Sequence, residues 1–183
     1  RLIIIKTPFV DLKSQYISIK EEIDVAIQNV ISETAFVRGK YTRNFEEEYA
    51  DAYGVKNCIS CANGTDAIYI TLKVLGIGPG DEVITVANSW ISTSETISQA
   101  GAKPVFVDIN PDYYTIDVLK IEEKITPKTK AIIPVHLFGQ PAEMDVIIDI
   151  CKRHNLLLIE DCAQAHFAEW KGHKVGTMGI AGT

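Results

Sequence analysis

Hydrophobic and polar positions along the chain follow two periods, one typical of helices and one typical of buried strands. Residues 11–32 and 42–53 space their apolar side chains as helices do, and Gly54 closes the second stretch. Further on, short apolar runs alternate with helical stretches. The predicted strands are 57–62, 82–87, 103–108, 130–135 and 156–159, and the predicted helices between them are 66–75, 92–100, 117–125 and 143–154. This alternation predicts an α/β fold, a mostly parallel doubly wound sheet with helices on both faces.

The last predicted strand gives the clearest indication of a site. Leu156–Ile159 is an unbroken apolar run that stops at Glu160 and Asp161. Such a run is typical of a parallel strand buried on both faces, and open α/β sheets bind ligands beyond the carboxyl ends of their strands. We therefore expect the Asp161 carboxylate at the ligand-binding edge, with Gln164 and His166 just beyond it.

Other polar and aromatic residues are predicted to reach the same edge. Gly64 and Thr65 follow a predicted strand and open a helix, so their N–H groups could bind an anion; a plain capped helix start is the alternative. Trp90 follows the next strand and could stack on a planar ligand or pack on the core. His136 follows the fourth strand and is either a substrate contact or a structural histidine.

Composition and charge narrow the function. The 183 residues are 46% hydrophobic and 23% charged, as in ordinary soluble domains, and the net charge of −6 argues against nucleic-acid binding. The apolar run Leu2–Ile5 is too short for a signal peptide or a membrane span, so we expect a cytoplasmic protein. Residues 171–174 are predicted to form the turn of a small hairpin.

The spacing of Cys58 and Cys61 raises the question of a metal or redox site. Both cysteines fall in the predicted strand 57–62, where they would face opposite sides and could not bind one ion. We therefore expect buried structural thiols and no metal site.

An anion-binding helix start, an aromatic ring and a carboxylate at one edge suit a phosphorylated, planar, cationic heterocycle. Pyridoxal 5′-phosphate (PLP) has this chemistry, because its ring nitrogen must stay protonated to accept electrons.

Several strings resemble the DegT/StrS-type nucleotide-sugar aminotransferases, PLP-dependent enzymes of fold type I. They are FVDLKSQY, NGTDAI, GPGDEVITVANSW, GAKPVFVDI, IPVHLFGQPAEMD and IEDCAQAH. The resemblance implies that Gly64 and Thr65 hold the cofactor phosphate and that Trp90 stacks on the pyridine ring. It also implies that Asp161 pairs with the ring nitrogen, as the catalytic residue in this chain, and that Gln164 contacts the phenolic oxygen. His136 and His166 are the candidate substrate contacts.

The resemblance further implies a homodimer that moves an amino group from glutamate to a keto-sugar nucleotide in deoxyaminosugar biosynthesis. These strings are most similar to those of enzymes that aminate dTDP-linked 3-keto-6-deoxysugars and build sugars for cell-surface polysaccharides. A PLP- or PMP-dependent sugar dehydratase and a non-catalytic regulatory relative are the alternatives.

Two departures from the family pattern bear on the site. Phe167 stands where a glycine is usual, which would narrow the space beside the cofactor. The family's Schiff-base lysine is expected beyond Thr183. We therefore expect residues 1–183 to be the N-terminal part of the PLP-binding large domain, with its remainder and the C-terminal small domain absent from this chain.

Overall fold

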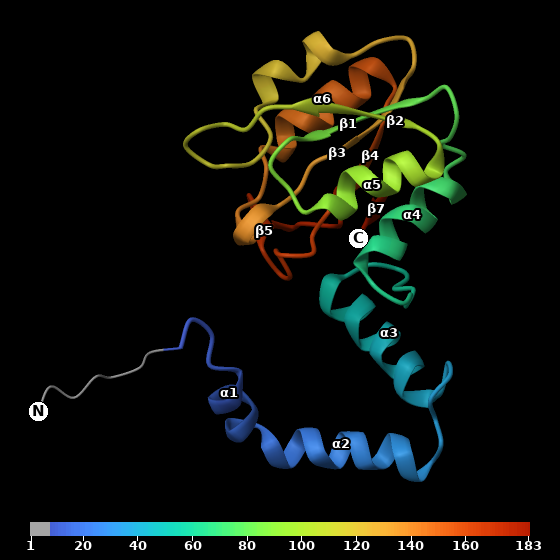
Figure 1. Ribbon diagram of the computed structural model, residues 1–183, viewed down its shortest axis with the longest axis vertical. Helices are drawn as coiled ribbons and strands as arrows, with labels where there is room; N and C mark the ends of the chain where they lie inside the picture. The colour runs from blue at the N-terminus through green and yellow to red at the C-terminus, as the bar shows by residue number, and fades with distance from the viewer. Residues whose placement is uncertain (1–7) are drawn as a thin grey trace, which may run out of the picture.

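The computed structural model describes residues 8–183, so the run Leu2–Ile5 lies outside the described part. A parallel sheet of five strands in the order β2-β1-β3-β4-β7 forms its centre (Figure 1). These strands are β1 (Glu82–Val86), β2 (Lys103–Val107), β3 (Thr129–Ile133), β4 (Leu157–Glu160) and β7 (Ala181–Gly182). A separate hairpin joins β5 (Glu169–Trp170) and β6 (His173–Lys174). The predicted α/β fold with a mostly parallel sheet is confirmed.

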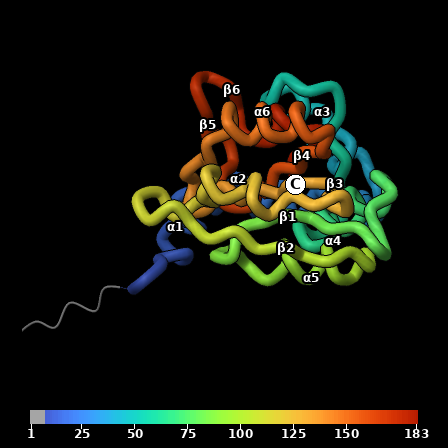
Figure 2. Tube along the Cα trace, turned by 90° about the horizontal axis from the view of Figure 1, so that it is seen from above, coloured from blue at the N-terminus to red at the C-terminus, as the bar shows by residue number. Residues whose placement is uncertain are grey.

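Helices cover both faces of the sheet, as predicted. They are α1 (Leu12–Ser18), α2 (Lys20–Ser32), α3 (Lys40–Tyr53), α4 (Gly64–Val74), α5 (Ile91–Ala100) and α6 (Met144–His154), with 3-10 turns η1 (Val118–Lys120), η2 (Glu122–Lys124) and η3 (Leu137–Gly139). Figure 2 shows α6 on one side of the sheet and α4 and α5 on the other. Each face therefore has its own apolar core.

The side-chain alternation of the strands divides the apolar residues between these two cores. Ile84 and Ile132 join the core that includes α6, whereas Val83, Ala131 and Ile133 join the core with α4 and α5. All five are fully buried. Burial of both faces explains why the central strands read as continuous apolar runs.

The predicted strand 57–62 is wrong. Residues 57–62 form an irregular segment, and its one large apolar side chain, Ile59, is 82% exposed. The fifth strand of the sheet is instead β7, which pairs in parallel with β4 through Ile159–Ala181 and Glu160–Gly182. A two-residue strand has no periodic pattern by which the sequence could have revealed it.

Two predicted helices also differ from the structure. The stretch 11–32 is broken at Ile19, where the Ser18 hydroxyl donates to the Gln15 carbonyl and competes with the helical hydrogen bonds. The stretch 117–125 forms the turns η1 and η2 in place of an α-helix, although Asp117 caps it as predicted, through Leu119 N. The hairpin at residues 169–174 is confirmed, with its turn at Lys171 and Gly172.

Helices α1 and α2 extend away from the sheet (Figure 1). Each of their residues is exposed or half-buried, including Leu12, Ile17, Ile23 and Ile27. Across residues 8–183, none of the helices has the length and apolar character needed to cross a bilayer.

Candidate active site

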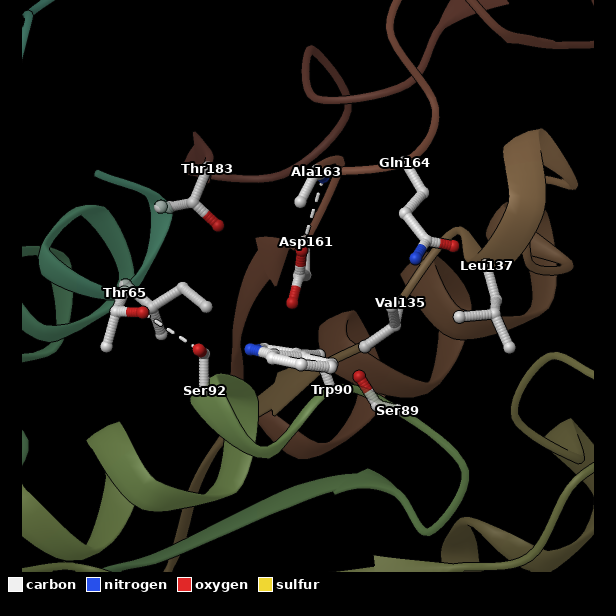
Figure 3. Close-up of a pocket in the computed structure, with 12 residues that line it drawn as sticks. Thr65, Ser89, Trp90, Ser92, Val135, Leu137, Asp161, Ala163, Gln164 and Thr183 are labelled. Atoms are coloured by element: carbon white, nitrogen blue, oxygen red, sulfur yellow. Dashed lines mark hydrogen bonds between the residues drawn. The ribbon is translucent and has the colours of Figure 1, made fainter. Parts of the chain in front are cut away.

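A cavity of about 250 Å³ opens beyond the carboxyl ends of the strands (Figure 3). The starts of α4 and α5, the loop after β3 and the loop after β4 form its wall. The wall residues are Gly64, Thr65, Ile68, Ser89, Trp90, Ser92, Val135, Leu137, Asp161, Ala163, Gln164 and Thr183. It thus brings together five of the residues predicted from the sequence, namely Gly64, Thr65, Trp90, Asp161 and Gln164.

The start of α4 supplies an anion-binding edge. Asn63 caps the helix, with its Oδ1 accepting from Asp66 N at 2.9 Å. The N–H groups of Gly64 and Thr65 come before the first intrahelical bond, from Ala67 N to Asn63 O, so they have no partner within the helix. A Cβ on Gly64 would meet no atom within 4 Å, so open space lies in front of this backbone. The helix start, and not a preceding strand, therefore makes the predicted anion site.

Asp161 is held from both its backbone and its side chain. Its N–H donates to Pro134 O and its carbonyl accepts from His136 N, both at 3.0 Å, which extends the β3–β4 pairing to the cavity edge. Asp161 as a whole is 6% exposed, and its carboxylate accepts from Thr93 Oγ1 at 2.8 Å and from Ala163 N at 3.3 Å. The result is a rigid carboxylate at the cavity wall.

Thr93 is a residue of this site that the sequence did not reveal. It lies on α5, it is 1% exposed, and its hydroxyl also lies 3.0 Å from the Ser89 hydroxyl. Because an ionised carboxylate only accepts, Thr93 must donate to Asp161, and Ser89 must then donate to Thr93. A threonine within a helix gives no sign of this contact, which depends on the packing of α5 beside the end of β4.

Trp90 provides the aromatic surface of the cavity. The residue is 75% exposed, so it does not pack in the core, the alternative considered from the sequence. Figure 3 shows the indole below Asp161, with the carboxylate pointing toward it. A planar ligand could lie against this ring.

Gln164 is oriented by the backbone of Phe138. Phe138 has a left-handed φ of 56° and donates its N–H to Gln164 Oε1 at 2.9 Å. The side-chain oxygen is therefore occupied, and the NH2 group turns toward the cavity (Figure 3). A donor in this place suits an anionic ligand oxygen.

The two histidines expected to contact substrate lie outside the cavity wall. The expectation for His136 is wrong: it is fully buried, its Nδ1 accepts from Ala142 N at 3.0 Å, and its Nε2 lies 3.2 Å from Glu160 Oε2. The structural alternative describes it. His166 is exposed and shares a 2.8 Å hydrogen bond with the Tyr49 hydroxyl, and its contact with substrate stays a prediction.

Phe167 does not narrow the cavity, contrary to the expectation from the sequence. Its ring packs on Tyr53 with a centroid distance of 4.7 Å, and its N–H donates to the Tyr53 hydroxyl at 2.7 Å. These contacts hold the ring against α3, outside the cavity wall. The backbone of Phe167 is left-handed, with a φ of 60°.

The expectation of buried thiols at positions 58 and 61 is also wrong. Cys58 is half-buried and Cys61 is exposed, because their segment is irregular and lies outside the sheet. Cys151 and Cys162 are the buried thiols, and burial raises the pKa of Cys151 to about 12.

The cavity as a whole fits a phosphorylated, planar, cationic heterocycle such as PLP. The N–H groups of Gly64 and Thr65 suit the phosphate, and the exposed indole of Trp90 suits a flat ring. The Asp161 carboxylate suits a protonated ring nitrogen, and the Gln164 NH2 group suits a phenolate oxygen.

Comparison with known proteins agrees with this geometry. Residues 17–183 match the DegT/DnrJ/EryC1/StrS aminotransferase family. The chain is 48% identical, over 96% of its length, to a "Pleiotropic regulatory protein" of Geobacillus stearothermophilus. It is also 48% identical, over 91% of its length, to the UDP-2-acetamido-2-deoxy-3-oxo-D-glucuronate aminotransferase of Pseudomonas aeruginosa. The chain spans 47% and 46% of these two relatives, about half of each.

Solved structures show the same relationship. The X-ray structure of S. venezuelae DesV in complex with a ketimine intermediate matches with a TM-score of 0.91 and 40% identity. This match covers 93% of the present chain and 46% of DesV. Relatives at similar distances are named for UDP-, GDP- and dTDP-linked sugars.

Proposed function

The chain belongs to the DegT/DnrJ/EryC1/StrS aminotransferase family, and from this premise we propose that the full-length protein is a PLP-dependent sugar aminotransferase. Aminotransferases of this family and fold use PLP. The observation that carries the proposal is the cavity, whose wall joins an unpaired helix start, an exposed indole, a buried carboxylate and an amide donor.

Each of these residues has a binding task in the proposal. PLP, when bound, supplies a carbonyl carbon that carries the amino group and a protonated ring that accepts electrons. Gly64 and Thr65 bind its phosphate through their N–H groups, Trp90 stacks on its ring, and Gln164 donates to its phenolic oxygen. Asp161 holds the proton on the ring nitrogen and does not itself move protons during the reaction.

A separate group must act as general acid and base. Among residues 8–183, the cavity wall contains no lysine. We place the Schiff-base lysine beyond Thr183, and we take residues 1–183 as the N-terminal part of the cofactor-binding large domain. Sequencing or mass mapping of the full-length protein with borohydride-reduced PLP would locate the modified lysine.

For the substrate, we propose glutamate as amino donor and a keto-sugar nucleotide as acceptor, with a dTDP-linked keto-6-deoxyhexose as the first choice. The supporting observation is that relatives of similar identity are named for amino sugars carried on dTDP, UDP or GDP. The choice of dTDP also follows the sequence strings that resemble dTDP-sugar enzymes.

The test is to supply full-length protein with PLP, glutamate and matched keto-sugars linked to dTDP, UDP or GDP. Mass spectrometry should show an amino-sugar nucleotide, formed fastest with dTDP. The variant Asp161→Asn, which cannot hold a proton on the ring nitrogen by charge, should lower turnover at least about 100-fold. A product that has lost a hydroxyl group without gaining nitrogen would identify a dehydratase instead.

A second candidate function is regulation without catalysis. It is favoured by the relative in G. stearothermophilus, whose name describes a regulatory protein at 48% identity. Full-length protein that stays colourless with added PLP and gives no product would support this candidate.

We also propose that the full-length protein is a cytoplasmic homodimer. Light scattering of the full-length protein in solution would test the dimer.

A further inference from the structure

Glu160 carries a second buried carboxylate next to Asp161, outside the cavity wall. Its side chain is fully buried and accepts four hydrogen bonds. Oε1 accepts from Met178 N at 2.8 Å and from Gly179 N at 2.7 Å, and Oε2 accepts from Gly176 N at 2.8 Å and from His136 Nε2 at 3.2 Å. The carboxylate is therefore surrounded by donors, three of them from one short segment.

The histidine of this group is oriented by hydrogen bonds at both ring nitrogens. Its Nδ1 accepts the Ala142 N–H, so Nε2 must carry the ring proton and donate it to Glu160. Burial alone would raise the pKa of Glu160, but the hydrogen bonds from His136, Gly176 and Gly179, together with the charge attraction of His136, outweigh burial and keep that pKa below its ordinary value. An ionised carboxylate held by N–H donors is thus the state that the contacts favour.

A metal ion is the other use that such a cluster suggests. His136, Glu160 and Cys162 have ligand atoms within 4.8 Å of one another. Both oxygens of Glu160 already face N–H groups, whose positive ends would repel a cation at the same point. The cluster is therefore built to hold an anion, and Glu160 is that anion.

The segment bound by Glu160 leads directly to the cavity. Residues 176–179 continue into β7 and Thr183, and Thr183 is part of the cavity wall. Thr183 N donates to the Glu160 carbonyl and Cys162 N donates to the Thr183 carbonyl, both at 2.8 Å. Glu160 thus holds the beginning of the segment with its side chain and the end with its backbone.

Close packing gives this segment little freedom to lie elsewhere. A Cβ on Gly179 would stand 2.5 Å from the Leu158 carbonyl oxygen, and one on Gly182 would stand 2.5 Å from Gly176 Cα. The backbone at Gly179 therefore lies directly against β4, and that at Gly182 lies directly against Gly176. Figure 3 shows the resulting place of Thr183, on the same side of the cavity as Thr65.

We propose that Glu160 is a positioning residue: its carboxylate folds residues 176–183 onto the end of β4 and so sets Thr183 in the cavity wall, near the phosphate-binding start of α4. The inference rests on the proposed function only in its choice of ligand. His136 is its partner, one of the four donors.

The test compares full-length wild type with Glu160→Gln, using pyridoxamine 5′-phosphate (PMP) as the probe because it binds without a covalent bond to the protein. A glutamine turns an NH2 group toward backbone N–H groups, so residues 176–179 should come loose. We expect PMP affinity to fall at least about tenfold. Hydrogen exchange at the amides of residues 176, 178, 179 and 183 should speed up, while the amides of β1 keep their protection.

Two further variants separate positioning from plain loss of stability. Ile84→Val removes one methylene from the buried core of β1, so it should lower the melting temperature and leave the affinity for PMP unchanged. His136→Leu removes one of the four hydrogen-bond donors to Glu160 and should weaken PMP binding by about threefold. If Glu160→Gln does not fold, His136→Leu provides the test in its place.

The outcomes distinguish the inference from the proposed function. If wild type does not bind PMP, the proposed function fails, and the exchange measurement still decides the role of Glu160. Wild-type affinity together with wild-type protection of residues 176–183 in Glu160→Gln would overturn the positioning role. The positioning role would also be overturned if Ile84→Val, measured where it is as stable as Glu160→Gln, lost as much affinity for PMP as Glu160→Gln does.

Discussion

Replacing Thr93 by valine removes one hydroxyl group and keeps the shape of the side chain. Thr93 is 1% exposed and its Oγ1 lies 2.8 Å from Oδ2 of Asp161, a residue that is 6% exposed. The variant would leave this carboxylate with the 3.3 Å bond from Ala163 N as its remaining donor among those described. A hydrogen bond to a charged group contributes about 1.5–3 kcal/mol, and the added methyl group recovers at most about 0.8 kcal/mol. We therefore expect the free energy of unfolding to fall by about 1–2 kcal/mol.

Urea denaturation of the full-length protein without cofactor, followed by tryptophan fluorescence, measures this change. The decisive control is a double-mutant cycle with Asp161→Ala. Without the carboxylate, Thr93 has lost its acceptor, so Thr93→Val should cost at least about 1 kcal/mol less in that background. An equal cost in both backgrounds would refute the claim that the hydroxyl acts through Asp161.

Three other changes test separate parts of the site. Asn63→Ala removes the cap of α4 and should lower the free energy of unfolding by about 1 kcal/mol. Asn63→Asp keeps the cap but should weaken PMP binding, because it sets a negative charge beside the phosphate. Equal PMP affinities of the two variants in titrations would count against the anion site. Phe167→Ala should destabilise the protein by about 1–2 kcal/mol, since the ring packs on Tyr53, and should leave the affinity for PMP within about twofold of wild type. A larger change in PMP affinity would show that the ring lies at the cavity. The pKa of Glu160 lies below its ordinary value of 4.5, so its stabilising effect is present above that pH and is lost as pH falls through the folded-state pKa. In urea titrations, the stability gap between wild type and Glu160→Gln should therefore shrink as the pH falls below 4.5, and a constant gap would contradict this role.

The sequence allowed the cavity wall to be predicted largely because its residues follow local patterns. Asp161 ends an apolar run, and Gly64 opens a helix behind a capping asparagine, so both could be placed at the carboxyl edge of a parallel sheet. The supporting residues follow no such pattern. Glu160 gains its role from N–H groups 16 to 19 residues further on, and Thr93 contacts a carboxylate 68 residues away. Those contacts exist only after the chain has folded.

The errors in the fold have the same origin. The segment 57–62 alternates as a strand does, yet the place beside β4 is taken by Ala181–Gly182, whose two small residues predict nothing by themselves. Backbone pairing with β4, together with the hold of Glu160 on residues 176–179, decides which segment completes the sheet. The sequence predicted His136 at the carboxyl edge of the sheet as a possible substrate contact. In the structure it is fully buried and contacts Glu160, and its position after a strand did not reveal this burial.

A crystal structure of the full-length protein grown with PMP would show whether this cavity holds the cofactor. We expect the phosphate at the N–H groups of Gly64 and Thr65, the ring against Trp90, the ring nitrogen at the Asp161 carboxylate and the phenolic oxygen at the Gln164 NH2 group. PMP bound elsewhere, or in this cavity with its ring nitrogen turned away from Asp161, would show that these residues do not form the cofactor site.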